Sequence, residues 1–323
     1  MLAQRRSERR VAVASLVVLS AVGAELLAAY NDTTGRPLAL LGNLIFFALL
    51  YGCPALLIRE LTRRTGRGWT TMLLLSAAAG LTQAGLLDQS LFAERYDDVR
   101  GWEESYRATA IEPLGVSAYM LQNFLLGHIV YSFCAPIALV EAMCPSVARR
   151  PWLGRAGIVV ATGLWLLVAG AIFADAGYAT LPELAVTLTV VVALIAAALR
   201  FGGRASRTSM GAGTPRAGTV LAVSFVAATA HALMPDDWVG TAGAFLIATA
   251  AAAGLIRAAR GSAWGLPHCA ALATGVLLSR GALAFTYYPV VGHTSAAAKY
   301  GHNVVMLGLV VAAGVYAARR SAG

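Results

Sequence analysis

VAVASLVVLSAVGAELLAAY, residues 11–30, holds one charged side chain, Glu25, in a run that is otherwise uncharged. A helix of about 20 such residues is long enough to cross the ~30 Å hydrocarbon core of a bilayer. Similar runs recur along the chain, and they lack the alternation of β-barrel strands. The chain is 58% hydrophobic and 13% charged, whereas soluble domains carry about 25% charged residues. The sequence therefore predicts an all-α, polytopic transmembrane helical bundle.

The apolar runs predict about ten membrane-spanning helices. We expect them at residues 11–30, 37–58, 69–92, 115–142, 156–174, 184–199, 217–233, 239–256, 266–287 and 296–318. The first run is too long, and is followed by too many others, to be a cleaved signal peptide. A Gly-, Ser-, Thr- and Arg-rich cytoplasmic linker at 201–216 separates six helices in residues 1–200 from four in residues 217–323. We expect both parts to form one structural domain.

Basic residues gather at alternate ends of these runs. All but six of the 25 lie in segments that would share one side of the membrane; the exceptions are Arg36, Arg95, Arg100, Arg107, Arg280 and Lys299. Because arginine-rich loops stay in the cytoplasm, we expect both termini to be cytoplasmic in a multi-pass protein of a bacterial plasma membrane. This pattern accounts for the net charge of +9, so no nucleic-acid partner is expected.

Six polar residues in or beside the apolar runs are candidates for lining an outward-facing cavity. Ionisable groups inside a bilayer are costly and normally face the bundle interior. The candidates are Glu25, Gln83, Asp88, Gln122, His128 and His302. His128 could move protons, or it could be a neutral histidine bonded to a neighbouring helix. Glu25 could instead pair with a glutamine or histidine, and Asp88 could face the lipid headgroups.

The loop at residues 93–114, expected outside the membrane, holds six acidic residues and three arginines with aromatic residues between them. It is longer than a simple connection needs. It could form an amphipathic lid at the membrane interface, or it could be a solvated loop. The lid residues would be Tyr96, Asp97, Asp98, Trp102, Glu103 and Glu104. Their spacing does not match a calcium-binding EF-hand.

Metal and cofactor signals are absent from the sequence. The four cysteines, Cys53, Cys134, Cys144 and Cys269, show no CxxC or Cys/His spacing, so we expect free, buried thiols, no metal site and no cofactor. A divalent metal would enter only if the chain were an enzyme. Ser295, Lys299 and His302 share one helix face. Lys299 could extend to the outer surface or take part in a site.

Two stretches echo each other in parallel. Residues 53–60 and 134–141 each begin with a cysteine, contain a proline within three positions and end on a glutamate. The echo could reflect a duplication or a coincidence between apolar segments. Each proline removes a backbone hydrogen bond, so we expect both helices to bend there.

Phe124-Leu-Leu-Gly-His128 and the later His302-Asn303 resemble motifs of the CAAX-prenyl-protease and bacteriocin-immunity superfamily of intramembrane enzymes. Those proteins also carry Glu-Glu-x-x-x-Arg. Here Glu103-Glu104-Ser-Tyr-Arg107 is one residue shorter and lies in a polar loop, and the corresponding helix reads Thr82-Gln83. In general style the chain is similar to uncharacterised membrane proteins of actinobacteria.

The simplest function is transport of a small solute or a lipid-like molecule, with that ligand and the lipid bilayer as partners. Proton coupling through Glu25 or His128 would fit this function. One alternative is a membrane-embedded enzyme that acts on a lipid, isoprenoid or peptide, with His128 and His302 as acid–base groups or metal ligands. The other is an accessory subunit of a membrane complex. No Walker loop, G-x-S-x-G, H-E-x-x-H or Asp-rich prenyl-diphosphate motif is present.

Overall fold

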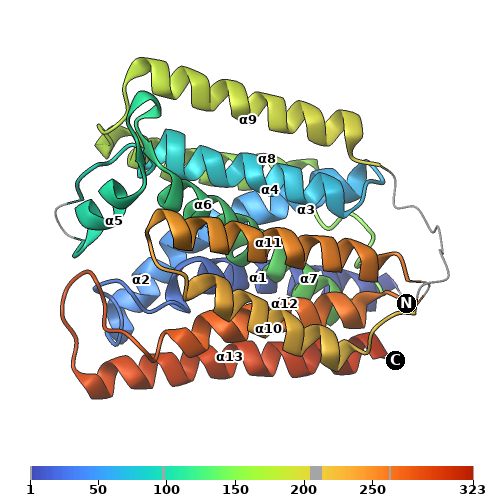
Figure 1. Ribbon diagram of the computed structural model, residues 1–323. Helices are drawn as coiled ribbons and strands as arrows, with labels where there is room; N and C mark the ends of the chain where they lie inside the picture. Colours follow the sequence, from blue (N-terminus) through green and yellow to red (C-terminus); the bar gives the residue numbers. More distant parts are fainter. Residues whose placement is uncertain (1, 97–98, 204–212, 262, 323) are drawn as a thin grey trace.

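The computed structural model describes residues 2–96, 99–203, 213–261 and 263–322. Within them the chain is almost entirely helical (Figure 1). Its helices are α1 (Leu2–Ala21), η1 (Val22–Leu26), α2 (Pro37–Phe47), η2 (Ala48–Gly52), α3 (Cys53–Arg64), α4 (Trp69–Leu81), η3 (Thr82–Leu87), α5 (Trp102–Ala108), η4 (Glu112–Leu114), α6 (Ala118–Gly127), η5 (His128–Cys134), α7 (Ala135–Met143), α8 (Arg155–Asp175), α9 (Leu181–Phe201), α10 (Ala217–Ala232), α11 (Trp238–Ala259), α12 (Leu266–Leu283) and α13 (Ala296–Ala322). Strands β1 (Ala110–Ile111) and β2 (Val116–Ser117) pair antiparallel, with Ala110 opposite Ser117. Asp97, Asp98 and residues 204–212 of the predicted linker lie outside the described residues.

Seven helical segments are long and apolar enough to cross a membrane. They are Pro37–Arg64, Trp69–Leu87, Ala118–Met143, Arg155–Asp175, Leu181–Phe201, Trp238–Ala259 and Ala296–Ser321. The helix α10 is apolar but has only 16 residues, and α1 and α12 are not among the seven. The predicted all-α, multi-pass membrane fold is confirmed at this level, whereas ten crossings stay a prediction.

The first and third long helices end earlier than the apolar pattern predicts. The first ends at Leu26 and the third at Leu87, not at residues 30 and 92. Shortly after each end, Ala29 and Gln89 have φ angles of 52° and 55°. A residue in this left-handed conformation ends a helix. Glycine is the usual residue at such a position. Because Ala29 and Gln89 are not glycine, the sequence did not indicate that the helices end there.

Each of the first four long helices contains a π-helical segment: η1, η2, η3 and η5. The segments η2 and η5 come directly before Cys53-Pro54 and Ala135-Pro136. Because proline has no N–H to donate, the hydrogen-bond ladder is interrupted there and the helix widens. The predicted irregularity at both prolines takes this form. The segments η1 and η3 contain no proline and end their helices. Such segments are rare and often lie at functional sites.

The two ends of the bundle differ. Both termini lie at one end, which we call the termini end, and α5 lies at the opposite, lid end (Figure 1). In the centre, α12 packs on α7, α10 and α13, and α1 packs on η2 and α7. The peripheral helices α8, α9 and α11 expose large aliphatic side chains such as Leu167, Leu181 and Val239. An apolar surface of this extent suits contact with lipid.

Two glycines let the π-helical segments approach their neighbours closely. A Cβ on Gly23 of η1 would collide with the carbonyl oxygen of Tyr131 on η5. A Cβ on Gly52 of η2 would lie 2.7 Å from the Cα of Val17 on α1. The backbones of these segments are therefore in direct contact, and their polar side chains are held inside the bundle.

Candidate functional site

The candidate site is centred on the buried carboxylate of Glu25 on η1, whose residue is 8% exposed. Its Oε1 accepts a 2.6 Å hydrogen bond from the hydroxyl of Tyr51 on η2. Its Oε2 accepts a second bond from Tyr30, which follows η1. Within the described part of the chain, no basic side chain lies within 4.0 Å of this carboxylate. Glu25 is thus hydrogen-bonded by neutral groups without forming an ion pair.

His128, the first residue of η5, lies beside this carboxylate and its tyrosines. Its ring stacks on that of Tyr51, with centroids 5.7 Å apart. Its Nδ1 lies 3.2 Å from the Oγ of Ser132. A Cβ on Gly80 of α4 would lie 2.8 Å from the Cβ of His128, so this glycine makes room for the histidine. Direct contacts therefore connect Glu25, Tyr51 and His128.

Gln83 and Asp88 form a polar contact of their own at the end of η3. Gln83 Nε2 donates to Asp88 Oδ2 at 3.1 Å, and the N–H of Ser90 donates to Asp88 Oδ1 at 2.9 Å. The helix α4, which η3 continues, packs on η5. A second carboxyl group thus lies on the helix beside His128.

Arg280 and His302 approach η1 from α12 and α13. Arg280 Nη2 donates to the carbonyl oxygen of Ala24 at 2.8 Å, and its guanidinium carbon lies 4.5 Å from the ring centroid of Tyr131. His302 Nε2 lies 2.8 Å from the carbonyl oxygen of Leu26. Both carbonyls belong to η1, where the π-helical winding breaks the regular ladder. These two side chains therefore hold the irregular backbone around Glu25.

Three of the six predicted cavity residues, Glu25, His128 and His302, lie on η1 or are joined to it by contacts, and Gln83 and Asp88 bond each other at the end of η3. Four further members, Tyr30, Tyr51, Tyr131 and Arg280, were not predicted. Arg280 could have been found, because an arginine within an apolar run carries the same cost as a glutamate. The tyrosines could not, because an aromatic residue in an apolar helix is ordinarily part of the core.

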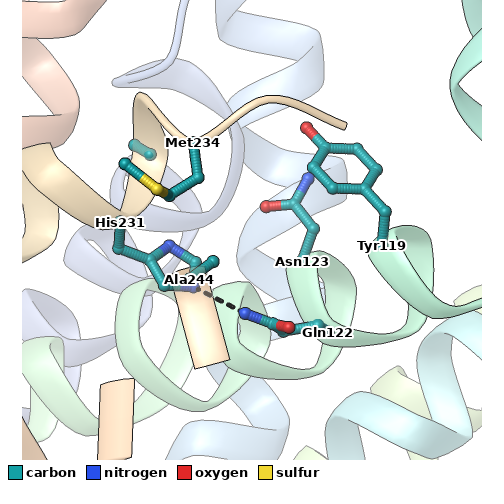
Figure 2. A pocket seen from close by; sticks show the side chains of 7 residues that line it. Tyr119, Gln122, Asn123, His231, Met234 and Ala244 are labelled. Atoms are coloured by element: carbon teal, nitrogen blue, oxygen red, sulfur yellow. Dashed lines mark hydrogen bonds between the residues drawn. The ribbon is translucent and has the colours of Figure 1, made fainter. Parts of the chain in front are cut away.

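Gln122, the sixth predicted residue, lies in a different contact (Figure 2). Its Nε2 is 3.3 Å from Nε2 of His231 on α10. With its amide turned over, it also donates to the Thr241 carbonyl and accepts from the N–H of Phe245, both at 3.1 Å. The cavity here holds about 20 Å³ and is also lined by Tyr119, Asn123, Ala232, Met234 and Ala244. That is room for one water-sized molecule, so Gln122 joins α6, α10 and α11.

The aromatic residues of the predicted lid form a stack. The Tyr96 ring lies 4.9 Å from that of Trp102 and 5.2 Å from that of Tyr178. Trp102 also reaches Phe124 of α6, at 5.8 Å between centroids. Burial, with smaller contributions from the charges of Asp88, Tyr178 and Asp175, raises the pKa of Tyr96 to about 12. The lid is therefore packed against the bundle by its aromatic side chains.

Polar contacts fasten the lid to two other connections. The Ser105 hydroxyl donates to the carboxylate of Asp236 between α10 and α11. Arg100 donates to the carbonyl of Pro289, between α12 and α13, at 2.6 Å. Glu103 forms exposed ion pairs with Arg95 at 3.0 Å and Arg107 at 2.8 Å. Glu104 is exposed. These contacts favour a docked lid over a freely solvated loop.

A larger cavity, of about 500 Å³, lies between the lid and the start of α9. Its lining combines aromatic, acidic and backbone groups of Phe92, Glu94, Tyr106, Arg107, Ala110, Ile111, Glu112, Gly115, Val116 and Glu183. The hydroxyl of Tyr106 donates to the Gly115 carbonyl at 2.7 Å. The lid end thus contains a polar hollow large enough for a small solute.

A second buried polar network lies at the termini end, where the two echoing stretches meet. Glu141 accepts hydrogen bonds from Arg59 Nε at 3.1 Å and Arg63 Nη2 at 2.5 Å. Glu60 pairs with Arg64 at 2.7 Å and accepts from the N–H of Trp152 at 2.8 Å. Arg59 also donates to the carbonyls of Val147, Ala148 and Arg150. Both carboxylates are thus paired with arginines.

Lys299 on α13 is completely buried and does not extend to the outer surface. Its Nζ donates to the carbonyl of Ala284 at 2.9 Å. It also lies 4.8 Å and 4.7 Å from the ring centroids of Tyr288 and Tyr300. Cation–π contacts of this kind stabilise an ammonium group away from water, so the lysine anchors the start of α13.

The remaining predicted groups form no cluster. All four cysteines are free, two of them buried and two partly buried. Among the residues that the structure describes, no group of three or more His, Cys, Asp or Glu side chains could hold a metal ion. His268 Nε2 lies 3.1 Å from the Pro215 carbonyl, outside the Glu25 cluster.

No protein-family model matches this chain, and comparisons with curated proteins and with solved structures give no match.

Proposed function

We propose that the protein is a transporter of a small solute or lipid-like molecule with ten membrane-spanning helices. The termini end faces the cytoplasm and the lid end faces outward, in a bacterial plasma membrane. Three features support this orientation: the arginines concentrated at the termini end, the two termini lying at that end (Figure 1), and the acidic lid at the other. The apolar helices α1, α10 and α12 supply the three crossings beyond the seven long ones.

The observation that carries the proposal is the state of Glu25. Its carboxylate is buried on a π-helical segment and bonded by the hydroxyls of Tyr30 and Tyr51. Over the residues that the structure describes, it forms no ion pair with a basic side chain. A charged group in this position is costly, and neutral hydroxyls offset only part of the cost. Such a carboxyl is able to take up a proton when it is closed off and release it when water gains access. That is the requirement for a proton-coupled transporter.

The structure also offers space and irregular helices of the kind that a transporter needs. A cavity of about 500 Å³ lies between the lid and the start of α9, and in this proposal the solute enters from that end. The irregular helices η1, η2, η3 and η5 supply the places where the bundle could bend between two access states.

The test is proton movement in proteoliposomes that contain a pH-sensitive dye. Three permanently charged or neutral solutes of similar size are added outside: benzenesulfonate, phenyltrimethylammonium and benzyl alcohol. The proposal predicts that at least one of them drives proton entry, that Glu25→Gln abolishes this entry, and that Asp32→Asn, which alters an exposed carboxylate, leaves it unchanged. Proton entry that persists in Glu25→Gln, or no response to any of the three, would overturn the proposal.

A further inference from the structure

Arg280 is a half-buried cation whose hydrogen-bonding capacity is largely unused. A guanidinium group has five N–H donors. Its Nη2 donates to the Ala24 carbonyl, while its Nε is buried and has no hydrogen-bond partner among the described residues. No carboxylate of the described chain lies within 4.0 Å of it. Burying such a group without a counter-charge is unfavourable.

Arg59 shows how this same fold satisfies a buried arginine that has a structural role. It pairs with Glu141 at 3.1 Å, donates to three backbone carbonyls and covers the ring of Trp152 at 3.5 Å. Arg280 has one carbonyl and one aromatic face. This difference leaves Arg280 with free N–H donors that can bind a negatively charged partner.

The groups around Arg280 define what that partner would meet. The titratable groups near enough to feel the charge of Arg280 are Glu25, Tyr30, His128, Tyr131 and Tyr287. Tyrosine rings offer apolar faces together with hydroxyl groups. A planar guanidinium binds carboxylate, sulfonate and phosphate oxygens through paired N–H donors.

We propose that Arg280 binds the anionic group of the transported solute, which is therefore an organic oxyanion with an apolar body. This inference rests on the proposed transport function and names its substrate class. Arg280 and Glu25 meet at η1, because Arg280 donates to the carbonyl of Ala24, the residue before Glu25. An ionised Glu25 would repel a second anion beside Arg280, whereas a protonated Glu25 would not. The anion and the proton therefore bind together, and each increases the affinity for the other.

The test measures binding of benzenesulfonate to the full-length protein in lipid nanodiscs by calorimetry, with phenyltrimethylammonium as the cationic counterpart. We expect saturable binding of the anion only. Arg280→Gln should weaken it at least tenfold and Arg280→Lys by less, whereas Arg257→Gln, an exposed arginine on α11, should leave it unchanged. Because Arg280→Gln could fail to fold, Glu25→Gln provides a second readout. It should remove the loss of affinity that the native protein shows as the pH rises.

The outcomes separate this inference from the transport function. Benzenesulfonate binding that is equal in native protein and Arg280→Gln, or a preference for phenyltrimethylammonium, would overturn the anion site. Glu25-dependent proton entry driven by the cation or by benzyl alcohol would keep the transport function and remove the anion. Arg280-dependent benzenesulfonate binding without any proton entry would keep the anion site and remove the transport function.

Discussion

Each of the two buried polar networks of this protein contains a buried carboxyl group, but different side chains bond it. At the termini end, Glu141 is enclosed by Arg59 and Arg63 and is 1% exposed. Around η1, Glu25 is also buried but is bonded by Tyr30 and Tyr51. Arginine side chains are donors that stay charged, whereas hydroxyls can donate to an ionised carboxyl group or accept from a protonated one. The first network therefore surrounds its carboxyl group with cations, and the second surrounds it with groups that suit either form.

The positions of the two networks agree with this difference. The paired network connects α3, α7 and the segment between α7 and α8. There the Arg59 guanidinium lies over the ring of Trp152 at the termini end. The Glu25 network connects three π-helical segments, η1, η2 and η5, to α12 and α13. The predictions below test whether the same chemical change has different consequences in the two places.

The largest expected effect is that of Glu141→Gln. Removing this charge leaves Arg59 and Arg63 buried without their partner, and breaking such a pair costs about 3–5 kcal/mol. Thermal unfolding in detergent should show a corresponding loss of stability. Arg107→Gln serves as the control, because the Arg107 and Glu94 side chains of its ion pair are 56% and 53% exposed and exposed pairs contribute about 0–1 kcal/mol. Equal losses in the two variants would remove the distinction.

Glu25→Gln, the same substitution in the other network, should cost much less stability. The amide can still accept from one tyrosine hydroxyl and donate to the other, and no buried arginine loses an ion pair. We expect a loss of about 1 kcal/mol in the same unfolding measurement. A loss as large as that of Glu141→Gln would show that Glu25 is a structural anchor.

Tyr51→Phe should have a comparable or smaller effect on stability and a specific effect on function. It removes the 2.6 Å bond to Glu25 and keeps the ring that stacks on His128. One hydrogen bond of this kind contributes about 0.5–1.5 kcal/mol. The pH dependence of proton entry into proteoliposomes should shift, whereas it should not shift in Tyr316→Phe, an exposed tyrosine of α13.

The smallest effect is expected in the lid, for Glu103→Gln. Its ion pairs with Arg95 and Arg107 are exposed, so their loss should change stability by less than about 1 kcal/mol. Trp102→Ala should change it more, because the indole packs on Tyr96 and Phe124. Limited proteolysis of residues 93–114 measures how firmly the lid is docked. Faster cleavage in Glu103→Gln than in Trp102→Ala would mean that charge pairs, not aromatic packing, hold it.

Much of the helical fold could be predicted from the sequence, and the reasons for the misses are physical. Apolar runs of about 20 residues identify helices, and Pro54 and Pro136 marked the positions next to η2 and η5. The segments η1 and η3 contain no proline, so nothing in their sequence distinguished them from regular helix. Ala29 and Gln89 adopt positive φ without being glycine.

The sequence indicated which polar residues lie in or beside apolar runs, but not the direction in which their side chains point. On this basis Glu25 and His128 were both candidates for one cavity. The direction in which a side chain points depends on packing between helices, so Gln122 was grouped with them although it contacts His231. Arg280 was counted only as a basic residue, because the charge pattern that sets topology does not separate loop arginines from those inside a run.

The central claim is that Glu25 exchanges a proton inside the bundle. Infrared difference spectroscopy of the protein in lipid nanodiscs, recorded between two pH values, detects the carbonyl stretch of a protonated carboxyl group. The account predicts a pH-dependent band that disappears in Glu25→Gln and persists when Asp32 is replaced by asparagine. A spectrum with no such band, or a band that is unchanged in Glu25→Gln, would contradict it.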